Sequence, residues 1–337
     1  MPQIQQNISL KPYNTFGIDV YALYFCDCQS ENDLIEILNT SKYKQLKKLV
    51  LGGGSNVLFT TDFNGLIILN SIKGKEKVHE DDNTIDLRVG AGEDWDELVE
   101  YTVKNDWAGL ENLSYIPGKV GASPIQNIGA YGEEVKNTVS KVETIDIHKQ
   151  KKVNYKNKDC QFGYRSSIFK HELKGKRIIT HVTFTLNKQH IFNLDYGVLE
   201  ETVNKKGKAT LQNIRNSIIE IRKSKLPEPE VLGSAGSFFK NPIIEADQYT
   251  QLQKKFPNIP AYKLSENEFK VPAGWLIDQL GWKGYKEGDA GVHTQQALVL
   301  VNYGNASGQQ IYNLSQRIIK SVKEAYGIQL EHEVNIV

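Results

Sequence analysis

One stretch of the sequence, residues 233–242, concentrates groups that could do chemistry, and it reads Gly-Ser-Ala-Gly-Ser-Phe-Phe-Lys-Asn-Pro. Its glycines let the main chain approach a ligand closely. Phe238 and Phe239 favour an extended strand, which would hold the hydroxyl of Ser237 rigidly at its start. Such a mixture of hydroxyl, cation and amide suits a wall around a reacting group. From these residues alone, the alternative is a surface loop that enters a strand.

Two further candidates lie far away in the sequence. Arg165 is flanked by aromatic residues in Phe-Gly-Tyr-Arg-Ser-Ser-Ile-Phe at 162–169, where its guanidinium could clamp a carboxylate through two parallel hydrogen bonds. The alternative is a stacked structural arginine. Near the C-terminus, strand alternation places Glu331 and Glu333 on one face and His332 with the apolar residues on the other. The alternative to a catalytic role for such a carboxylate is simple solvation.

The distances along the sequence do not show whether Ser237, Arg165 and Glu333 meet. No Ser-His-Asp order, Cys-His pair or metal-binding cluster offers a competing mechanism. Of the three cysteines, Cys26 and Cys28 would share one face of a strand, and no CxxC motif or histidine pair completes a metal site. We therefore expect free thiols in a reducing cytoplasm and no bound metal.

Three glycine-rich tracts could hold a phosphate-bearing ligand. The first, Gly-Gly-Gly-Ser-Asn at 52–56, follows a predicted strand, so its amides could form a nest for phosphate oxygens. It matches neither a Walker A loop nor a Rossmann fingerprint, and the second tract, 90–95, lacks the third glycine of GxGxxG. The third, 117–132, combines small residues and prolines with the amides of Gln126 and Asn127. Together the tracts favour a long ligand such as a dinucleotide, and the alternative is three ordinary turns.

Hydrophobic periodicity, capping residues and prolines predict the elements that must position these groups. Helices are expected at 30–39, 94–103, 211–221, 273–280 and 307–326. Strands are expected at 48–51, 66–69, 84–89, 142–147, 177–186, 296–301 and 328–337. Pro227 and Pro229 end the third helix and mark the best domain boundary. The pattern predicts a mixed α and β protein without internal repeats.

Length and charge restrict the possible functions. A chain of 337 residues is too long for one ordinary core, so we expect two or three domains. Lysine and arginine number 41 against 40 acidic residues, and this balance argues against a nucleic-acid or anionic-membrane partner. No apolar stretch approaches the roughly 20 residues that span a bilayer, and the N-terminal residues lack the pattern of an export signal. We expect a soluble cytoplasmic protein.

A series of motifs follows the order found in a known family. They are Asn-Thr-Phe-Gly at 14–17, Gly-Gly-Gly-Ser-Asn-Val-Leu at 52–58, Gly-Leu-Glu-Asn-Leu at 109–113, Ile-Pro-Gly at 116–118, the tract 121–132, Phe-Gly-Tyr-Arg at 162–165, Lys-Leu-Pro at 225–227, Gly-Ser-Phe-Phe-Lys-Asn-Pro at 236–242, Ala-Gly-Trp-Leu-Ile-Asp at 273–278 and Gln-Ala-Leu-Val at 296–299. Over nearly its whole length the chain resembles UDP-N-acetylenolpyruvoylglucosamine reductase, the MurB flavoenzyme of peptidoglycan precursor synthesis. Tyr196, within Leu-Asp-Tyr-Gly, resembles the extra tyrosine loop of the type I branch.

The resemblance implies an α+β protein in which two subdomains of the vanillyl-alcohol-oxidase type bind FAD and a third domain closes over the substrate. The implied domains are 1–72 with 327–337, 73–226, and 227–326 for the substrate. FAD would be held without a covalent link, and the first two glycine tracts contain no histidine or cysteine that could form one. NADPH would reduce the flavin and leave before the enolpyruvyl sugar nucleotide enters. We expect a monomer.

The resemblance also implies a role for individual residues. Hydride would reach the vinyl carbon distal to the carboxylate, Ser237 would donate a proton to the neighbouring carbon, and Arg165 and Glu333 would stabilise the enolate. The implied substrate-binding residues are Tyr196, Lys225 and Asn241. The implied FAD-binding residues are Gly52, Gly53, Gly54, Ser55, Asn56, Val57, Gly118, Gly121, Ala122, Ser123, Gln126, Asn127, Ile128, Gly129, Tyr131 and Gly132.

Two other functions stay open, and the chain departs from the family pattern at one end. A flavin oxidase of the same superfamily would use dioxygen and an alcohol, and an inactive relative would bind FAD or a UDP-sugar without turnover. The presence of Ser237, Arg165 and Glu333 argues against the inactive relative. In the family the last motif usually reads Glu-Val followed shortly by Ile-Gly, whereas this chain has Glu-Val-Asn-Ile-Val at 333–337. This departure bears on how the last strand is anchored.

Overall fold

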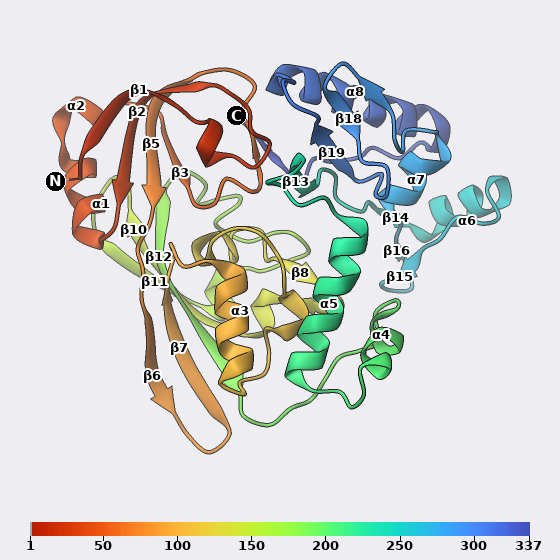
Figure 1. The fold of residues 1–337 in the computed structure, drawn as a ribbon, viewed down its shortest axis with the longest axis horizontal. Helices are drawn as coiled ribbons and strands as arrows, with labels where there is room; N and C mark the ends of the chain where they lie inside the picture. The colour runs from red at the N-terminus through yellow and green to blue at the C-terminus, as the bar shows by residue number, and fades with distance from the viewer. Residues whose placement is uncertain (1) are drawn as a thin grey trace. The chain divides into compact units, whose positions relative to one another are not determined.

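The computed structural model describes residues 2–337, and the chain divides into two compact units (Figure 1). Unit 1 comprises the described residues up to Ile8 with Tyr21–Gly53 and Phe63–Ser224, and unit 2 comprises Ser9–Val20, Gly54–Asp62 and Lys225–Val337. The predicted α+β class is confirmed, because both units combine helices with sheets. The three-domain division stays a prediction. No helix in the described part of the chain is long and apolar enough to cross a membrane.

One sheet of unit 1 has four strands in the order β1-β2-β5-β3, and both β2 and β3 run parallel to β5. The strands are β1 (Ile4–Ser9), β2 (Tyr21–Cys28), β3 (Lys48–Leu51) and β5 (Phe63–Asn70). Helix α1 (Glu31–Asn39) begins after Ser30, whose Oγ accepts a hydrogen bond from the amide of Asp33 at 3.1 Å. Its buried face joins the core of this sheet, and the short helix α2 (Ser41–Lys44) follows.

The second sheet of unit 1 is antiparallel, with the order β11-β10-β12-β7-β6. Its strands are β6 (Lys75–Glu80), β7 (Thr84–Gly90), β10 (Val139–Asp146), β11 (Lys152–Lys156) and β12 (Arg177–Asn187). Helix α3 (Trp95–Lys104) is capped by Asp94 and packs its apolar face into this core. The rings of Trp95 and Phe184 meet edge to face at 5.9 Å.

Helix α5 (Leu211–Lys225) lies beside α3 in unit 1 (Figure 1). The two helices are joined by Arg215, which is 6% exposed and donates two hydrogen bonds to the carboxylate of Asp96 at 2.6 and 2.8 Å. The remaining elements of unit 1 are α4 (Leu199–Lys205), β8 (Gly129–Ala130), β9 (Glu133–Glu134) and the 3-10 turns Glu111–Leu113, Val120–Ala122, Val135–Asn137 and Asn157–Cys160.

Unit 2 is built around an antiparallel sheet with the order β13-β19-β18-β17. These strands are β13 (Gly233–Ser237), β17 (Lys286–Glu287), β18 (Ala290–Val292) and β19 (Val299–Asn302). A smaller sheet contains β14 (Ile243–Glu245), β16 (Glu268–Lys270) and β15 (Tyr262–Lys263). The helices are α6 (Ala246–Lys255), α7 (Ala273–Gln279) and α8 (Gly308–Tyr326), with a 3-10 turn at Lys11–Tyr13. Ser307 caps α8, so the helix expected at 307–326 is present and begins one residue later.

The end of the chain differs from the expected strand at 328–337. The regular strand is short: β20 (Asn335–Ile336) pairs in parallel with β4 (Val57–Leu58). Buried and exposed residues do alternate before it, with Leu330 and Val334 buried, but this alternation reflects packing on one side rather than a continuous ladder. The last residue is nevertheless anchored. The carbonyl of Val337 accepts hydrogen bonds from the amide and the hydroxyl of Thr60, at 2.8 and 2.9 Å.

Candidate active site

Ser237 is the last residue of β13, so the expectation that it begins a strand was wrong. It pairs with Val299 of β19, and the amide of Phe238 donates a hydrogen bond of 2.7 Å to the carbonyl of Leu298. Gly236 has a φ of +67°, and this conformation suits the register shift inside β13. The strand therefore fixes the main chain on both sides of Ser237, whose side chain is half-buried.

After Ser237 the chain leaves β19 and runs beside the C-terminal segment. The amide of Glu333 donates a hydrogen bond of 2.8 Å to the carbonyl of Phe238. The amide of Lys240 donates one of 2.9 Å to the carbonyl of Glu331, and their side chains form an ion pair at 2.7 Å. Ser237 and Glu333 are thus brought together within unit 2 although they lie far apart in the sequence.

Asn56, from the first glycine tract, holds Glu333 from its other side. Its side-chain amide donates a hydrogen bond of 3.3 Å to the carbonyl of Glu333, and its own carbonyl accepts one of 3.1 Å from the amide of Asn335. Gly54, two residues earlier, has a φ of +61° and lies so close to Tyr13 that a Cβ would meet the carbonyl oxygen at 2.0 Å. Only glycine fits there, and this close contact fixes the approach of Asn56.

Arg165 lies in unit 1, against the third glycine tract. Its guanidinium donates a hydrogen bond of 2.5 Å to the carbonyl of Gly129 and one of 3.5 Å to that of Asn127. It also lies over the ring of Tyr164, with 5.4 Å between Cζ and the ring centroid, and its φ is +50°. Because the serine and the glutamate belong to unit 2, a common site for all three residues stays a prediction.

Within unit 1, the first two glycines of the first tract and the other two tracts lie close together through their main chains. A Cβ on Gly53 would lie 3.1 Å from the Cα of Gly118, which joins the first tract to the third. A Cβ on Gly121 would lie 2.6 Å from that of Ala91, and the amide of Gly121 donates a hydrogen bond of 2.9 Å to the carbonyl of Ala91. Side chains would separate these loops, so the glycines keep the main chains of the three tracts close together.

Ser123 and Asn127, two polar residues of the third tract, differ in whether the protein itself satisfies their side-chain hydrogen bonds. Ser123 is 2% exposed, and its Oγ has no hydrogen-bond partner among the described residues. A buried hydroxyl without a partner calls for an explanation, and a ligand group would supply one. The side chain of Asn127 instead donates to Glu134 at 3.0 Å and to the carbonyl of Gly163 at 2.9 Å, and accepts from the amide of Lys136 at 3.0 Å. Asn127 therefore shapes the tract, because its side chain is fully used within the protein.

Tyr131, an expected cofactor residue, lies beside Tyr196, an expected substrate residue, with their rings edge to face at 5.9 Å. Arg222 on α5 contacts Tyr131 as well, and burial lowers the pKa of this arginine while the tyrosine opposes the shift. It donates a hydrogen bond of 2.9 Å to the carbonyl of Tyr115. Arg222 was not among the site residues expected from the sequence. Its position two turns after the buried Arg215 was the available signal.

The other two expected substrate residues lie at helix ends. Lys225 is the last residue of α5 and is exposed. The side-chain oxygen of Asn241 accepts a hydrogen bond of 2.9 Å from the amide of Ala273, the first residue of α7. Asn241 therefore caps this helix and fixes the chain that follows the Ser237 segment.

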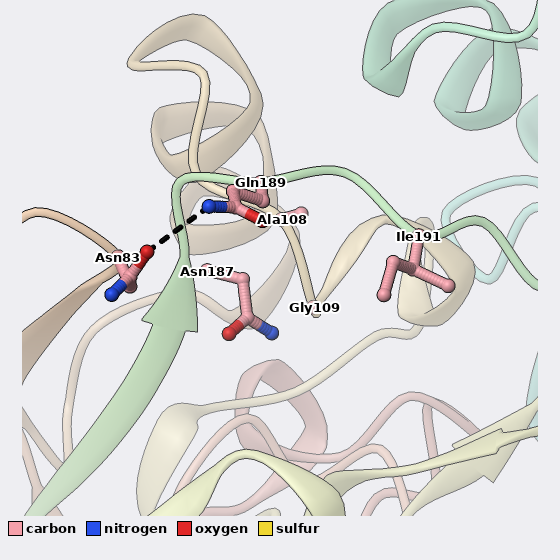
Figure 2. A pocket seen from close by; sticks show the side chains of 6 residues that line it. All are labelled: Asn83, Ala108, Gly109, Asn187, Gln189 and Ile191. Carbon is pink, nitrogen blue, oxygen red and sulfur yellow. Dashed lines mark hydrogen bonds between the residues drawn. The ribbon is translucent and has the colours of Figure 1, made fainter.

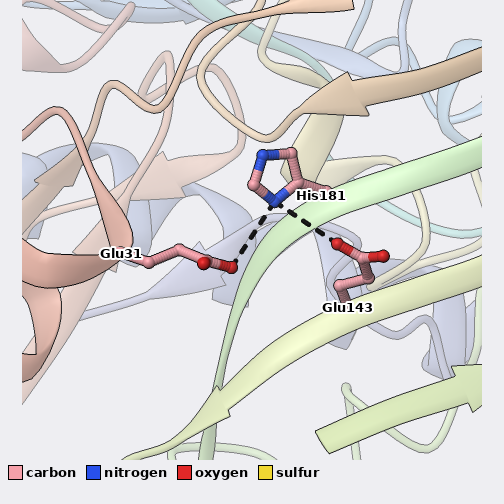
Figure 3. A group of neighbouring side chains, drawn as sticks. All are labelled: Glu31, Glu143 and His181. Carbon is pink, nitrogen blue, oxygen red and sulfur yellow. Dashed lines mark ion pairs between the residues drawn. The ribbon is translucent and has the colours of Figure 1, made fainter. Parts of the chain in front are cut away.

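A cluster of Glu31, Glu143 and His181 in unit 1 has the donor types of a metal site (Figure 3). The imidazole lies between the carboxylates, with Nδ1 at 3.7 Å from Glu31 and 3.6 Å from Glu143. Both carboxylates already have cations: Arg88 donates to Glu143 at 2.6 and 2.9 Å, and Lys152 pairs with Glu31. A metal ion would have to displace these cations, so we assign the cluster to the stability of the fold.

A hollow of about 250 Å³ on unit 1 contains none of the expected site residues (Figure 2). Ile191 on its rim is 91% exposed, and the side chain of Gln189 donates a hydrogen bond of 3.0 Å to that of Asn83. The hollow is lined by Asn83, Ala108, Gly109, Asn187, Gln189 and Ile191. It offers amides and aliphatic groups but no acid, base or nucleophile for catalysis.

Comparison with known proteins gives a consistent result over the whole chain. Residues 228–337 match the family model "UDP-N-acetylenolpyruvoylglucosamine reductase, C-terminal domain", and residues 22–149 match "FAD binding domain". The UDP-N-acetylenolpyruvoylglucosamine reductase of Flavobacterium johnsoniae is 49% identical over 99% of this chain and 100% of its own, and that of Amoebophilus asiaticus is 48% identical over 99% of both. The crystal structure of the Thermus caldophilus reductase has the same fold, with a TM-score of 0.69, 24% identity and coverage of 100% of this chain and 99% of its own.

Proposed function

Because this chain belongs to the UDP-N-acetylenolpyruvoylglucosamine reductase family, we propose that Ser237 protonates the substrate while Arg165 and Glu333 stabilise the charge on its carboxylate. The protein is an FAD-dependent oxidoreductase that uses NADPH as reductant. Its reaction converts UDP-N-acetylglucosamine enolpyruvate to UDP-N-acetylmuramate, a step of peptidoglycan precursor synthesis.

The glycine tracts of unit 1 fit a dinucleotide such as FAD. Gly53 and Gly118 bring two tracts into main-chain contact, and the buried Oγ of Ser123 offers a hydrogen bond that no described residue takes up. Main-chain amides and a hydroxyl are the groups that bind a pyrophosphate. We therefore assign FAD to the tract 52–57 and to the expected residues between 118 and 132. When bound, FAD carries the reducing equivalents of NADPH to the substrate as hydride.

Ser237 is the proposed proton donor. After the vinyl carbon distal to the carboxylate has gained a hydride, the neighbouring carbon carries negative charge, and the reaction is complete when that carbon takes up a proton. An alkyl hydroxyl is a weak acid, so Oγ of Ser237 can serve only a strongly basic carbon and only from a fixed position. The pairing of β13 with β19 on one side, and of Phe238 with Glu333 on the other, supports such a position.

Arg165 and Glu333 are assigned to the substrate carboxylate. Its negative charge grows as the enolate forms, so a guanidinium of Arg165 that binds it stabilises the transition state more than the ground state. Glu333, in its protonated form, can donate a hydrogen bond to the same carboxylate. The contacts that hold the main chain of Glu333 from two sides support this assignment, since charge stabilisation requires fixed groups.

The diphosphate and sugar of the substrate are assigned to Tyr196, Lys225 and Asn241. Tyr196 is 43% exposed and lies beside Tyr131, so part of this residue is open to a ligand next to the proposed FAD tract. Lys225 is an exposed cation at a helix end, which suits an anionic diphosphate. We also propose that the protein works as a monomer in the cytoplasm.

The observation that carries this proposal is the hydrogen bond between the amide of Glu333 and the carbonyl of Phe238, because it ties the glutamate to the residue that follows the proposed proton donor. The test uses purified protein with its absorption spectrum. A flavin spectrum, with NADPH oxidation that depends on the enolpyruvyl sugar nucleotide, is expected. A colourless protein, or one that releases peroxide from an alcohol without NADPH, would contradict the proposal, and the second result would favour a flavin oxidase.

A further inference from the structure

His332 lies between two acidic residues of the C-terminal segment, but its ring turns into unit 2. The main chain forms an isolated antiparallel bridge with Phe239. The imidazole meets the ring of Phe238 edge to face at 5.2 Å, and the rings of Phe239 and Tyr312 lie at 5.8 and 5.9 Å. It is therefore wedged between the residues that follow Ser237 and helix α8.

The polar edge of this ring is tied to α8. Nε2 of His332 lies 3.1 Å from Oγ of Ser315, a residue that is fully buried. The single hydroxyl proton of Ser315 is donated to the carbonyl of Tyr312 at 2.6 Å, so toward the imidazole the hydroxyl accepts. This arrangement makes Nε2–H the donor toward Ser315. The side-chain nitrogen of Gln316 lies 3.4 Å from the same ring atom, so this tautomer requires the amide of Gln316 to be turned with its oxygen toward the ring. Burial lowers the pKa of His332, in keeping with a neutral ring.

We propose that His332 is a positioning residue that fixes the proton donor Ser237 relative to Glu333 by fastening both of their segments to α8. This role rests on the function proposed above for those two residues. The imidazole is covalently next to Glu333, and its ring packs on the residue next to Ser237. Proton transfer is sensitive to placement, and a shift of about 1 Å can cost roughly a hundredfold in rate. Loss of the tether to Ser315 should therefore slow protonation of the substrate.

The test compares His332→Phe with His332→Gln in the holoenzyme. Phenylalanine keeps the aromatic packing and removes the Nε2–H donor, whereas glutamine keeps an N–H donor at a similar reach. We expect His332→Phe to slow reoxidation of the reduced flavin by the enolpyruvyl sugar nucleotide by about tenfold to a hundredfold. Reduction by NADPH and the FAD content should stay as in the wild type. His332→Gln should recover most of the lost rate.

Ser315→Ala removes the same hydrogen bond from the other side, so it should reproduce the loss, and the double variant should lose no more than either single variant. Ile318→Val serves as the matched control, because it trims a fully buried side chain on the same helix and lowers the melting temperature without touching the tether. Nitrogen-15 NMR of the imidazole gives a readout independent of activity. The wild-type signal that is absent from the spectrum of His332→Phe belongs to His332, and its chemical shifts should be those of an imidazole protonated on Nε2.

The proposal would be overturned if His332→Phe slowed both half-reactions equally, or if it lost no more reoxidation rate than Ile318→Val. An imidazole protonated on Nδ1 would also contradict it. So would a double variant whose loss of rate is the sum of the losses in His332→Phe and Ser315→Ala. Failure of the proposed function looks different. If the proposed function is wrong, the reduced flavin of the wild type will not be reoxidised by the sugar nucleotide, or that of Ser237→Ala will be reoxidised at the wild-type rate. Either result would also remove the positioning role of His332.

Discussion

The amide of Glu333 donates a hydrogen bond of 2.8 Å to the carbonyl of Phe238, the residue that follows Ser237. The carbonyl of the same glutamate accepts a bond from the side chain of Asn56 in the first glycine tract. Glu333 is therefore bound both to the residue that follows the proposed proton donor and to a tract proposed to bind FAD. These contacts fix the main chain of Glu333, and its proposed role in stabilising the substrate carboxylate depends on its position.

Ser123→Ala should weaken FAD binding without weakening the fold. The Oγ of Ser123 has no partner among the described residues, so its removal costs the protein no internal hydrogen bond. If FAD is that partner, its dissociation constant should rise about tenfold, since such a bond contributes on the order of 1–2 kcal/mol. Flavin fluorescence measures the affinity, and thermal melting of the apoprotein measures stability.

Ser114→Ala is the matched control for this prediction. Ser114 is also fully buried, but its hydroxyl donates a hydrogen bond of 2.6 Å to the carbonyl of Glu111. The variant should lose about 1 kcal/mol of stability and keep its affinity for FAD. An unchanged FAD affinity in Ser123→Ala would show that this hydroxyl faces no cofactor.

Acid should destabilise the fold partly through Glu143. Burial alone would raise the pKa of Glu143, but hydrogen bonds and charge from Arg88 and Lys141 outweigh it and lower this pKa to about 2. A depressed pKa means that the carboxylate stabilises the folded state above about pH 4.5, and that this contribution is lost as the pH falls toward 2. The contribution of this carboxylate to the free energy of unfolding is at most about 3 kcal/mol. Glu143→Gln should therefore show a shallower fall in unfolding free energy between pH 6 and pH 3, measured with urea.

Glu200→Gln, at an exposed position on α4, should keep the acid sensitivity of the wild type. If Glu143→Gln lost stability with pH as steeply as the wild type, the ion pairs of this cluster would contribute nothing to the pH dependence.

The three cysteines should be inert in the folded protein. The side chains of Cys26, Cys28 and Cys160 are fully buried, and burial raises the pKa of Cys160 to about 12. The hydrogen bond from Cys26, together with burial, raises the pKa of Cys28 as well. Because the thiolate is the reactive form, a thiol reagent at pH 8 should label none of them before denaturation and all three after it. Fast labelling of the native protein would contradict the burial of these side chains.

Elements with local signals could be predicted closely from the sequence. The helix expected at 30–39 is α1 (Glu31–Asn39) with Ser30 as its cap, and the strand expected at 48–51 is β3 (Lys48–Leu51). A cap acts within one turn, and a short apolar run before glycines marks a strand, so neighbours in the sequence suffice, although only Leu51 of β3 is buried. The strand expected at 328–337 failed because a strand ladder depends on a distant partner, which periodicity does not report.

The site could be predicted by residue type but not by arrangement. The contact of Glu333 with the segment after Ser237 joins distant parts of the sequence, so spacing could not reveal it. Arg222 was missed because only the aliphatic residues of α5 were counted, and the internal use of Asn127 depends on how the third tract folds back on Gly163. Such long-range polar contacts leave no periodic signal.

The function proposed here depends most on Ser237, which donates the proton that completes the reduction. The most direct measurement is anaerobic stopped-flow absorbance of the two half-reactions in wild type, Ser237→Ala and the exposed control Ser265→Ala. We expect all three proteins to be reduced by NADPH at nearly the same rate, and Ser237→Ala alone to be reoxidised by the enolpyruvyl sugar nucleotide orders of magnitude more slowly. Unchanged reoxidation, or equal slowing of both half-reactions, would contradict it.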